Sequence, residues 1–273
     1  PGLPLFRFVD SSEDESRLLI WAGSDRDPGR YYTYDRGSRR LNEIMLSRPQ
    51  LEGVELAEVR PVTYRSRDGV EIPAYLTLPP GSDGRGLPAI VMPHGGPEAR
   101  DEWGFDWLAQ YYAHRGFAVL QPNFRGSSGY GEDWFRENGF QAWRMAIGDV
   151  NDGGRWLVSE GIADPARLGI VGWSYGGYAA LQANVLDSGL FKAVVAIAPV
   201  TDLNLLKEQW RNWTSFAVVR DFIGSGPHTL EGSPAQNSRA TGAPVLLFHG
   251  DLDRNVFDRH SVLMDDRLRD VGG

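Results

Sequence analysis

One serine of this chain stands in a setting that could make it a nucleophile. The stretch from Leu168 to Ala180 reads LGIVGWSYGGYAA, an apolar run that passes through the pattern GxSxG into a segment of small residues. A sharp turn from a strand into a helix lifts a hydroxyl clear of a sheet, and it needs close neighbours without a Cβ, here Gly172 and Gly176. The pattern predicts that Ser174 is a nucleophile in a strained backbone conformation. The alternative is a glycine-rich turn with an idle serine.

Two glycines after another apolar run could stabilise charge in such a reaction. The run at residues 89–93 is followed by the motif HGGP, which begins at His94. Paired glycines let backbone amides approach a developing oxyanion, so we expect the N–H groups of Gly96 and Tyr175 to form an oxyanion hole. His94 could itself be the catalytic base, but a histidine before glycines more often fixes the geometry of the loop.

A candidate for the acid of a catalytic triad stands near the end of the chain. The apolar run at residues 244–248 is followed by HGDLDRNV, which contains Asp251 and Asp253. Hydrolases with a GxSxG turn between strand and helix carry their triad in the order Ser, Asp, His, so the acid is expected after Ser174. We predict that Asp253 is the acid. Asp251 lies nearer the strand and could instead hydrogen-bond the backbone of the turn.

Apolar runs alternate with helical patterns after residue 59. Residues 59–65 and 70–78 predict an antiparallel hairpin at the edge of a sheet. Buried strands are predicted at 89–93, 118–121, 168–172, 193–198 and 245–249, with helices at 103–115, 141–160, 178–186 and 214–222 between them. This alternation is typical of a mainly parallel, doubly wound α/β sheet with reactive groups at the carboxyl ends of its strands. We therefore expect an α/β-hydrolase fold over residues 53–273.

Residues 1–52 differ from the rest of the chain. Short β-rich runs at residues 17–22 and 31–34 are separated by turn residues, and another turn follows at 35–38. Such a unit cannot bury both faces by itself, so we predict a partial terminal blade of a β-propeller. A free-standing β-hairpin extension fits the pattern equally well. Because the chain begins without Met and ends directly after a predicted helix, we expect a fragment that is truncated at both ends.

Four motifs together resemble the prolyl oligopeptidase family of serine peptidases. They are HGGP at 94–97, NFRGSSGYG at 123–131, GWSYGGY at 172–178 and HGDLDRNV at 249–256. The resemblance covers nearly the whole chain and is greatest to acylaminoacyl-peptidase and dipeptidyl-peptidase-like members. It implies hydrolysis of short peptides through an acyl-enzyme, with a propeller that restricts access to the site.

The resemblance also implies roles in the chemical steps. Ser174 matches the nucleophile and Asp253 the acid. Tyr175 and Gly96 match the residues whose amides form the oxyanion hole. His94 stands where dipeptidyl-peptidase relatives have a tyrosine whose hydroxyl serves the oxyanion, and we place it among the substrate-binding residues.

Further residues are assigned to substrate binding by the same resemblance. Asn255 matches a residue that holds a backbone carbonyl of the substrate. Val200 and Val256, together with Tyr175, would line an apolar pocket for the residue before the scissile bond. Each of these three side chains could equally be ordinary core packing.

The histidine of the triad is the main departure from the family pattern. In the family it follows the acid by roughly 30 residues, after one more helix and strand, whereas 20 residues follow Asp253 here. We expect His260 at the start of a helix over 258–268, on the surface. His114 and His228 precede the acid. We therefore predict that the catalytic histidine is missing from these residues, so that this chain alone is nearly inert.

The composition of the chain limits the classes of molecule that it could bind. The chain is 41% hydrophobic and 23% charged, as is usual for a globular protein, and has no apolar run long enough to span a bilayer. Its formal net charge of -8 argues against nucleic acid or an anionic membrane as a partner, because phosphate binding needs a basic surface. The lack of cysteine excludes disulfides, thiolate metal sites and a cysteine nucleophile. We expect a short peptide as substrate, no metal or cofactor, and a cytoplasmic location, with export left open.

Three functions are compatible with these patterns. A serine peptidase is favoured by HGGP and by the blade-like first segment. A carboxylesterase of the same fold would more typically show HGGG or a lid region. A non-catalytic binding protein that retains the fold is disfavoured by the presence of both Ser174 and Asp253.

Overall fold

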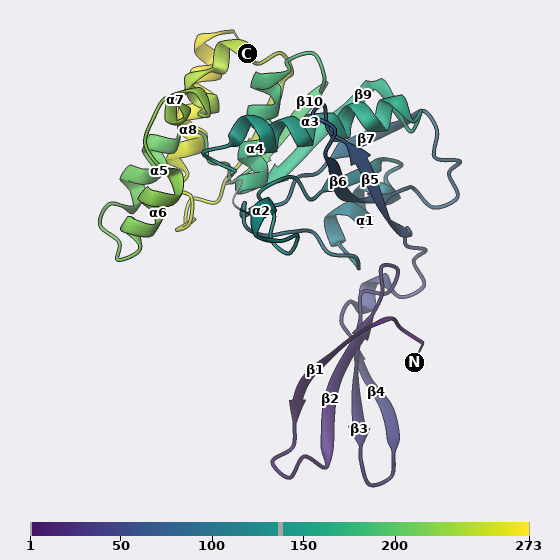
Figure 1. Cartoon of the computed structure of the whole chain (residues 1–273). Coiled ribbons are helices and arrows are strands. Elements are labelled where there is room, and N and C mark those ends of the chain that lie inside the picture. The colour runs from purple at the N-terminus through teal and green to yellow at the C-terminus, as the bar shows by residue number, and fades with distance from the viewer. Residues whose placement is uncertain (1, 136–138, 273) are drawn as a thin grey trace. The chain divides into compact units, whose positions relative to one another are not determined.

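The computed structural model of the chain describes residues 2–135 and 139–272. They divide into two compact units. Figure 1 shows the elements of both units, coloured by residue number. The first comprises Pro1–Arg60, Thr77–Asp83 and Glu102–Phe117, and the second comprises Pro61–Leu76, Gly84–Asp101 and Ala118–Gly273. Each unit is built on a sheet of its own.

The first unit contains a four-stranded antiparallel sheet in which the strands pair in chain order. These strands are β1 (Leu5–Ser11), β2 (Arg17–Gly23), β3 (Arg30–Asp35) and β4 (Arg40–Leu46). The two inner strands are the ones that the sequence predicts, and the two outer strands extend the hairpin into a meander. A short 3₁₀ helix (Pro49–Leu51) and helix α1 (Trp107–His114) complete the unit.

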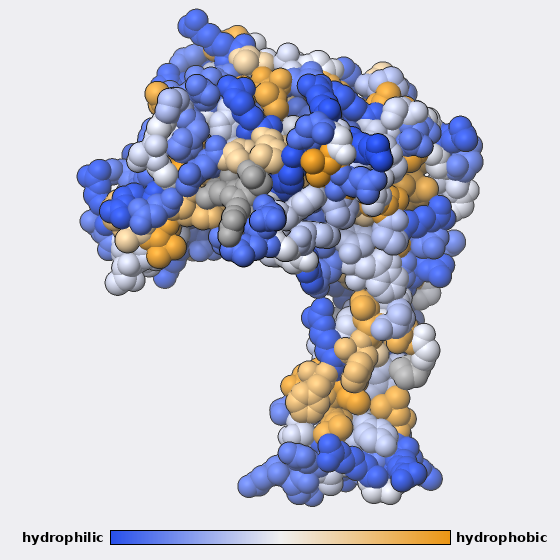
Figure 2. All heavy atoms as spheres, viewed as in Figure 1, coloured by the Kyte–Doolittle hydropathy of each residue, from blue (hydrophilic) through white to orange (hydrophobic). Residues whose placement is uncertain are grey.

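Apolar side chains of this first sheet lie exposed. Phe6 and Phe8 on β1 and Ile44 and Met45 on β4 are each more than half exposed, and Figure 2 shows hydrophobic residues gathered on this part of the molecule. A four-stranded meander with an uncovered apolar surface has the form of a propeller blade, since blades pack against one another. The observed sheet therefore agrees with the predicted blade.

The second unit is built on a seven-stranded sheet in the order β11-β10-β9-β7-β8-β6-β5. Its strands are β5 (Val59–Arg65), β6 (Glu71–Thr77), β7 (Leu87–Val91), β8 (Ala118–Pro122), β9 (Ala163–Trp173), β10 (Ala193–Ile197) and β11 (Val245–Phe248). The five strands from β7 to β11 run parallel to one another, and the predicted hairpin forms the edge of the sheet beyond β8. Val91, Leu120, Ile170 and Ala196 on four of these strands are fully buried. Burial on both faces explains why β7 and β8 read as continuous apolar runs. The prediction of a buried strand at 245–249 is wrong in this respect, because Leu246 and Phe248 on the edge strand β11 are each 52% exposed.

Helices cover this second sheet. They are α2 (Glu132–Phe135), α3 (Trp143–Ser159), α4 (Tyr175–Leu186), α5 (Leu203–Trp210), α6 (Phe216–Ile223), α7 (His228–Glu231) and α8 (Arg259–Asp270). Helix α4 packs on β9 and β10, α3 packs on α4 and the central strands, and α8 contacts β11. Figure 1 shows α5, α6, α7 and α8 grouped at one side of this unit. No helix in the described ranges is long and apolar enough to cross a membrane.

Candidate active site

Ser174 occupies the turn between β9 and α4. The strand ends at Trp173, and the helix begins at Tyr175. The backbone of Ser174 has φ 59° and ψ -119°, a conformation that residues with a side chain rarely adopt. Its N–H donates to the carbonyl of Ile197 at 2.8 Å, and its own carbonyl accepts from the N–H of Tyr178. The neighbouring strand and the helix thus hold the turn, while the half-buried hydroxyl of Ser174 bonds to none of the described residues.

Two glycines make this turn possible by close approach. A Cβ on Gly172 would collide with the carbonyl oxygen of Gly176, and a Cβ on Gly176 would collide with the carbonyl oxygen of Pro93. These oxygens belong to backbone, so they cannot swing aside as a flexible side chain could. The predicted requirement for glycine at both positions is confirmed.

The HGGP loop lies beside the serine. A Cβ on Gly95 would be 3.7 Å from the Cβ of Ser174 and 3.3 Å from the carbonyl oxygen of Trp173. Gly96 has φ 122°, in the region that favours glycine. Within residues 2–135 and 139–272, the N–H groups of Gly96 and Tyr175 have no hydrogen-bond acceptor. Both amides therefore have a free donor for a developing oxyanion in this part of the chain, and their role in an oxyanion hole stays a prediction.

His94 is buried, and protein groups engage both nitrogens of its ring. Nδ1 lies 2.7 Å from the carbonyl oxygen of Gly95, Nε2 lies 2.7 Å from Oγ of Ser127, and the ring stacks on Phe124. Burial lowers the pKa of His94 to about 4, so the ring is neutral at pH 7. Its contribution to substrate binding stays a prediction. In the structure the ring ties the HGGP loop to the NFRGSSGYG segment.

Arg125 fixes that second segment to the sheet and to α3. Its guanidinium binds the buried carboxylate of Asp149 with two nitrogens, at 2.9 and 2.6 Å, and binds Asp68 with the third, at 2.6 Å. Burial raises the pKa of Asp149, and the hydrogen bonds from Arg125 act against this rise. The bond from Arg125 is the main reason that the pKa of Asp68 falls to about 2. A forked cation between two carboxylates makes the loop around Arg125 a rigid support for His94.

Asp253 lies at the same edge of the sheet as Ser174. Strands β9, β10 and β11 are parallel neighbours, so the residues that follow them emerge together. Oδ1 of Asp253 accepts from the N–H groups of Asn255 at 2.8 Å and Val256 at 3.1 Å. Its Oδ2 lies 3.8 Å from Nε2 of His249 and accepts no hydrogen bond from the described residues. One carboxylate oxygen of Asp253 thus shapes its own loop and the other is open to a further group.

Asp253, and not Asp251, hydrogen-bonds the backbone of the turn. Asp251 is exposed at the start of the loop, where it forms no hydrogen bond with the described residues. His249 donates from Nε2 to the carbonyl of Val256 and accepts at Nδ1 from Ser261, both at 2.7 Å. Neither His94 nor His260 bridges Ser174 and Asp253. The choice of Asp253 as the acid stays a prediction.

The residues assigned to substrate binding fall into two groups. Asn255 is exposed, and its carboxamide bonds to none of the described residues. Val200, Val256 and Tyr175 are 3%, 5% and 1% exposed, so they lie in the core. The hydroxyl of Tyr175 donates to the carbonyl of Gly139 at 2.8 Å, and burial raises the pKa of Tyr175. Their part in a substrate pocket stays a prediction.

His260 corrects one expectation. It stands in the first turn of α8, as predicted, but it is fully buried rather than on the surface. Its Nδ1 accepts from the N–H of Thr201 at 3.1 Å, and its Nε2 has no partner among the described residues. Burial is the largest cause that lowers the pKa of His260, to about 4. The helical pattern did not reveal this, because the burial comes from the distant segment at Thr201.

We expect the free energy of unfolding to fall as the pH drops below 6.5. The pKa of His260 is about 4 in the folded chain, against an ordinary value of 6.5, so the unfolded chain binds the proton first. The contribution of neutral His260 to the free energy of unfolding is fully present above pH 6.5. Its loss approaches about 3 kcal/mol as the pH falls through 4. Urea unfolding at several pH values measures it. A His260→Gln variant should show a shallower fall, and the same fall in both proteins would contradict the assignment.

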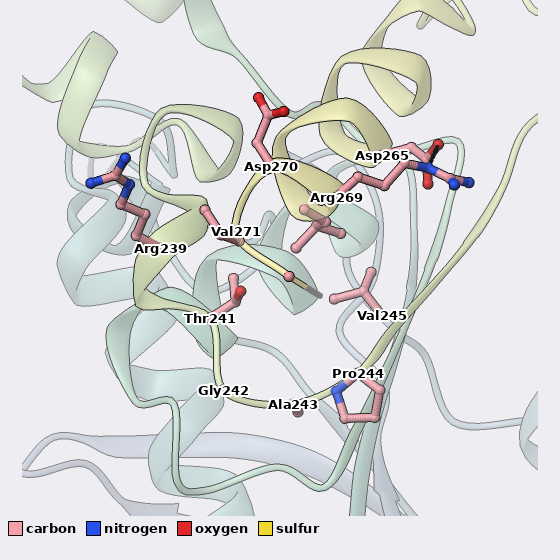
Figure 3. A pocket seen from close by; sticks show the side chains of 12 residues that line it. Arg239, Thr241, Gly242, Ala243, Pro244, Val245, Asp265, Arg269, Asp270 and Val271 are labelled. Atoms are coloured by element: carbon pink, nitrogen blue, oxygen red, sulfur yellow. Dashed lines mark hydrogen bonds and ion pairs between the residues drawn. The ribbon is translucent and has the colours of Figure 1, made fainter.

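One cavity of the described residues lies away from the candidate site. It has a volume of 830 Å³ and is lined by Arg239, Val245, Asp265 and Arg269 among others. Figure 3 shows these side chains around it, with Asp265 and Arg269 paired on α8. Val245 is the first residue of β11, whereas Asp253 follows the last, so the cavity is at the opposite end of the strand. In the described part of the chain no three His, Cys, Asp or Glu side chains are grouped as a metal site.

Comparisons with known proteins agree with this geometry. Dipeptidyl aminopeptidase BIII of Pseudoxanthomonas mexicana is 36% identical over 260 residues, which are 89% of this chain and 37% of that protein. An acylaminoacyl peptidase solved in complex with Z-Gly-Gly-Phe-chloromethyl ketone superimposes with a TM-score of 0.80 at 26% identity, over 99% of this chain and 43% of that one. A Mycobacterium tuberculosis puromycin-hydrolyzing peptidase gives 0.79 at 29% identity, over 94% and 40%. The chain thus spans about two fifths of these relatives.

The predicted α/β-hydrolase fold with a preceding blade is confirmed by these likenesses. Residues 103–273 match the prolyl oligopeptidase family, which is a match over more than half of the chain. Its relatives are peptidases, in accord with the predicted class of hydrolase. The chain belongs to the prolyl oligopeptidase family of serine peptidases.

Proposed function

We propose that the full-length protein containing this chain is a serine peptidase that hydrolyses short peptides through an acyl-enzyme. One observation carries the proposal. Ser174 stands at positive φ between β9 and α4, beside two amides that have no acceptor in the described part of the chain, and Asp253 follows a parallel strand at the same sheet edge. Family relatives that are named as dipeptidyl or acylaminoacyl peptidases support the substrate class.

In the first half of the proposed reaction, Oγ of Ser174 attacks the carbonyl carbon of the scissile bond and gives its proton to a base. The oxygen of the tetrahedral intermediate takes the negative charge and accepts from the N–H groups of Gly96 and Tyr175. One such donor contributes about 10²- to 10³-fold in rate. When the C–N bond breaks, the leaving amine takes the proton from the base. Water then hydrolyses the ester and restores the serine.

The base in this proposal is a histidine supplied from outside residues 1–273. Two observations support it. No histidine of the described residues hydrogen-bonds to Ser174 or Asp253, and Oδ2 of Asp253, which lies 3.8 Å from Nε2 of His249, accepts no hydrogen bond there. A carboxylate with one oxygen fixed by backbone and one open is suited to orient an imidazole. On this proposal the 273-residue chain alone is nearly inactive.

Substrate binding is proposed to involve Asn255 and an apolar pocket. The carboxamide of Asn255 is exposed and unengaged among described residues, so it can donate to a backbone carbonyl of a peptide. Val200, Val256 and Tyr175 are proposed to form the wall against the residue before the scissile bond. The first sheet is proposed to be one blade of a propeller that limits access to short peptides.

A comparison of two substrates tests the proposed class of reaction. The full-length protein should release p-nitroaniline from a short peptide anilide and p-nitrophenol from an activated ester, because a peptidase site cleaves both bonds. A carboxylesterase would cleave the ester and leave the anilide intact. Hydrolysis of the ester alone would therefore replace the peptidase proposal by the esterase alternative, and hydrolysis of neither would contradict both.

A further inference from the structure

Every backbone polar group from Asn255 to Phe257 in the acid loop is hydrogen-bonded, five of the six to side chains. The N–H groups of Asn255 and Val256 donate to Asp253, and the carbonyl of Val256 accepts from His249. The carbonyl of Phe257 accepts from the N–H of His260. Two groups are left in this stretch, the carbonyl of Asn255 and the N–H of Phe257. They are bound by one residue from a different part of the chain.

That residue is Gln209, in the last turn of α5. Its Nε2 donates to the carbonyl of Asn255 at 2.8 Å, and its Oε1 accepts from the N–H of Phe257 at 3.0 Å. The two bonds lie on either side of Val256. A carboxamide has one donor end and one acceptor end, so it can fix both a carbonyl and an amide at a set separation. Neither Glu as a carboxylate nor Met could make this pair of bonds.

Helix α5 holds the backbone of Gln209 in a fixed position. The carboxylate of Asp202 caps the helix by accepting from the N–H groups of Asn204 and Leu205, both at 2.8 Å, and Gln236 donates to its other oxygen. Leu203 and Leu206 anchor the helix in the core. The helix begins three residues after Val200. The bonds of Gln209 therefore connect the segment that follows Val200 to the loop that carries Val256.

We propose that Gln209 is a positioning residue for substrate recognition, which fixes Asn255 and Val256 relative to Val200. The inference rests on the proposed function, since it assigns a purpose to residues that are proposed to bind substrate. With its backbone held from both sides, the loop presents the carboxamide of Asn255, which bonds to none of the described residues, from a fixed point of the chain. Gln209 does not contact the reacting atoms and acts through these residues. It should therefore affect KM more than kcat.

A Gln209→Met variant of the full-length protein tests the proposal with a short peptide anilide. Methionine keeps the length and removes both bonds, so we expect KM to rise about tenfold while kcat changes less than about threefold. The matched control is Gln141→Met, because Gln141 also donates to two backbone carbonyls, those of Asp221 and Phe222. The control should keep the KM of the unaltered protein. An unchanged KM in Gln209→Met, or an equal rise in the control, would overturn the proposal.

A double-mutant cycle asks whether Gln209 acts through Asn255. In the unaltered protein Asn255→Ala should raise KM about tenfold, whereas in the Gln209→Met background it should add less than about twofold. Independent, additive effects would contradict the positioning role. Gln209→Glu supplies a second signature, because a protonated carboxyl again has one donor and one acceptor. Its kcat/KM relative to the unaltered protein should rise about threefold from pH 7 to 5, while the ratio for Gln209→Met stays flat.

Hydrogen exchange separates failure of this proposal from failure of the proposed function. In Gln209→Met the amide of Phe257 should exchange faster than in the unaltered protein, and the amides of β9 should not. An unchanged exchange rate at Phe257 would contradict the two-bond contact itself. Faster exchange with unaltered KM would leave the contact and the peptidase in place and reject the role in recognition. If the unaltered protein cleaves no peptide, the proposed function falls, and the inference falls with it.

Discussion

Replacing Ser174 by alanine in the full-length protein should abolish hydrolysis of a short peptide anilide, with kcat lowered by about a millionfold. The change removes the hydroxyl oxygen that the turn between β9 and α4 presents beside the amides of Gly96 and Tyr175, which have no acceptor among the described residues. The oxyanion hole and substrate binding would remain, and they leave a residual acceleration of about 10³- to 10⁴-fold over water. Initial rates at saturating substrate measure the loss.

A second serine provides the matched control for this experiment. Ser159 ends α3, and its hydroxyl makes one local bond to the carbonyl of Trp156. Ser159→Ala should retain the kcat of the unaltered protein. Circular dichroism should show all three proteins folded, so that a loss in Ser174→Ala is a loss of chemistry. Turnover that survives in Ser174→Ala would place the reaction at a different site.

The turn at Ser174 could be predicted from the sequence because its causes are local and steric. The glycines at 172 and 176 are needed where backbone oxygens approach within contact of the missing Cβ. The apolar run before the turn becomes β9, and the small residues after it become the buried helix α4. A pattern in which period, turn chemistry and packing all agree leaves few alternative folds. The parallel sheet was predictable for the same reason.

The outer strands of the first sheet and helix α5 were not predicted. Strands β1 and β4 carry charged and apolar residues without regular alternation, and they become strands by pairing with β2 and β3. Helix α5 did have a local signal, because Asp202 before an apolar residue is typical of a helix N-cap. That signal could have led to the helix, and from there to Gln209 in its last turn.

The burial and the pKa of the histidines depend on contacts between distant segments. The amphipathic pattern of α8 places His260 on the surface of the helix, yet the contact with Thr201 buries it. The ring of His94 is held by Ser127, 33 positions along the chain. Helical period and motif spacing describe a residue's neighbours along the chain, whereas its burial and its pKa are set by what packs on it in space. For the same reason, the sequence could suggest Asp253 as the acid but not which of its oxygens is engaged.

Extending the chain by its natural continuation should raise hydrolysis of a small activated ester or a peptide by about 10⁴-fold over the 273-residue chain. The reason is the proposed location of the base. A serine hydroxyl without a partner to take its proton is a weak nucleophile, and a general base contributes about 10²- to 10⁴-fold. Rates per folded molecule should be compared, with the folded fraction taken from urea unfolding of each chain.

The extended chain also distinguishes a missing base from a misfolded site. If Asp253 orients the added histidine, Asp253→Asn should lower the rate of the extended chain by about 10⁴-fold. The same change should leave the low rate of the 273-residue chain unaltered, since on this proposal the imidazole that the carboxylate orients is supplied by the extension. Asp251→Asn is the matched control, because Asp251 is exposed in the same loop. Robust turnover by the 273-residue chain, equal to that of the extended one, would mean that these residues already contain the base.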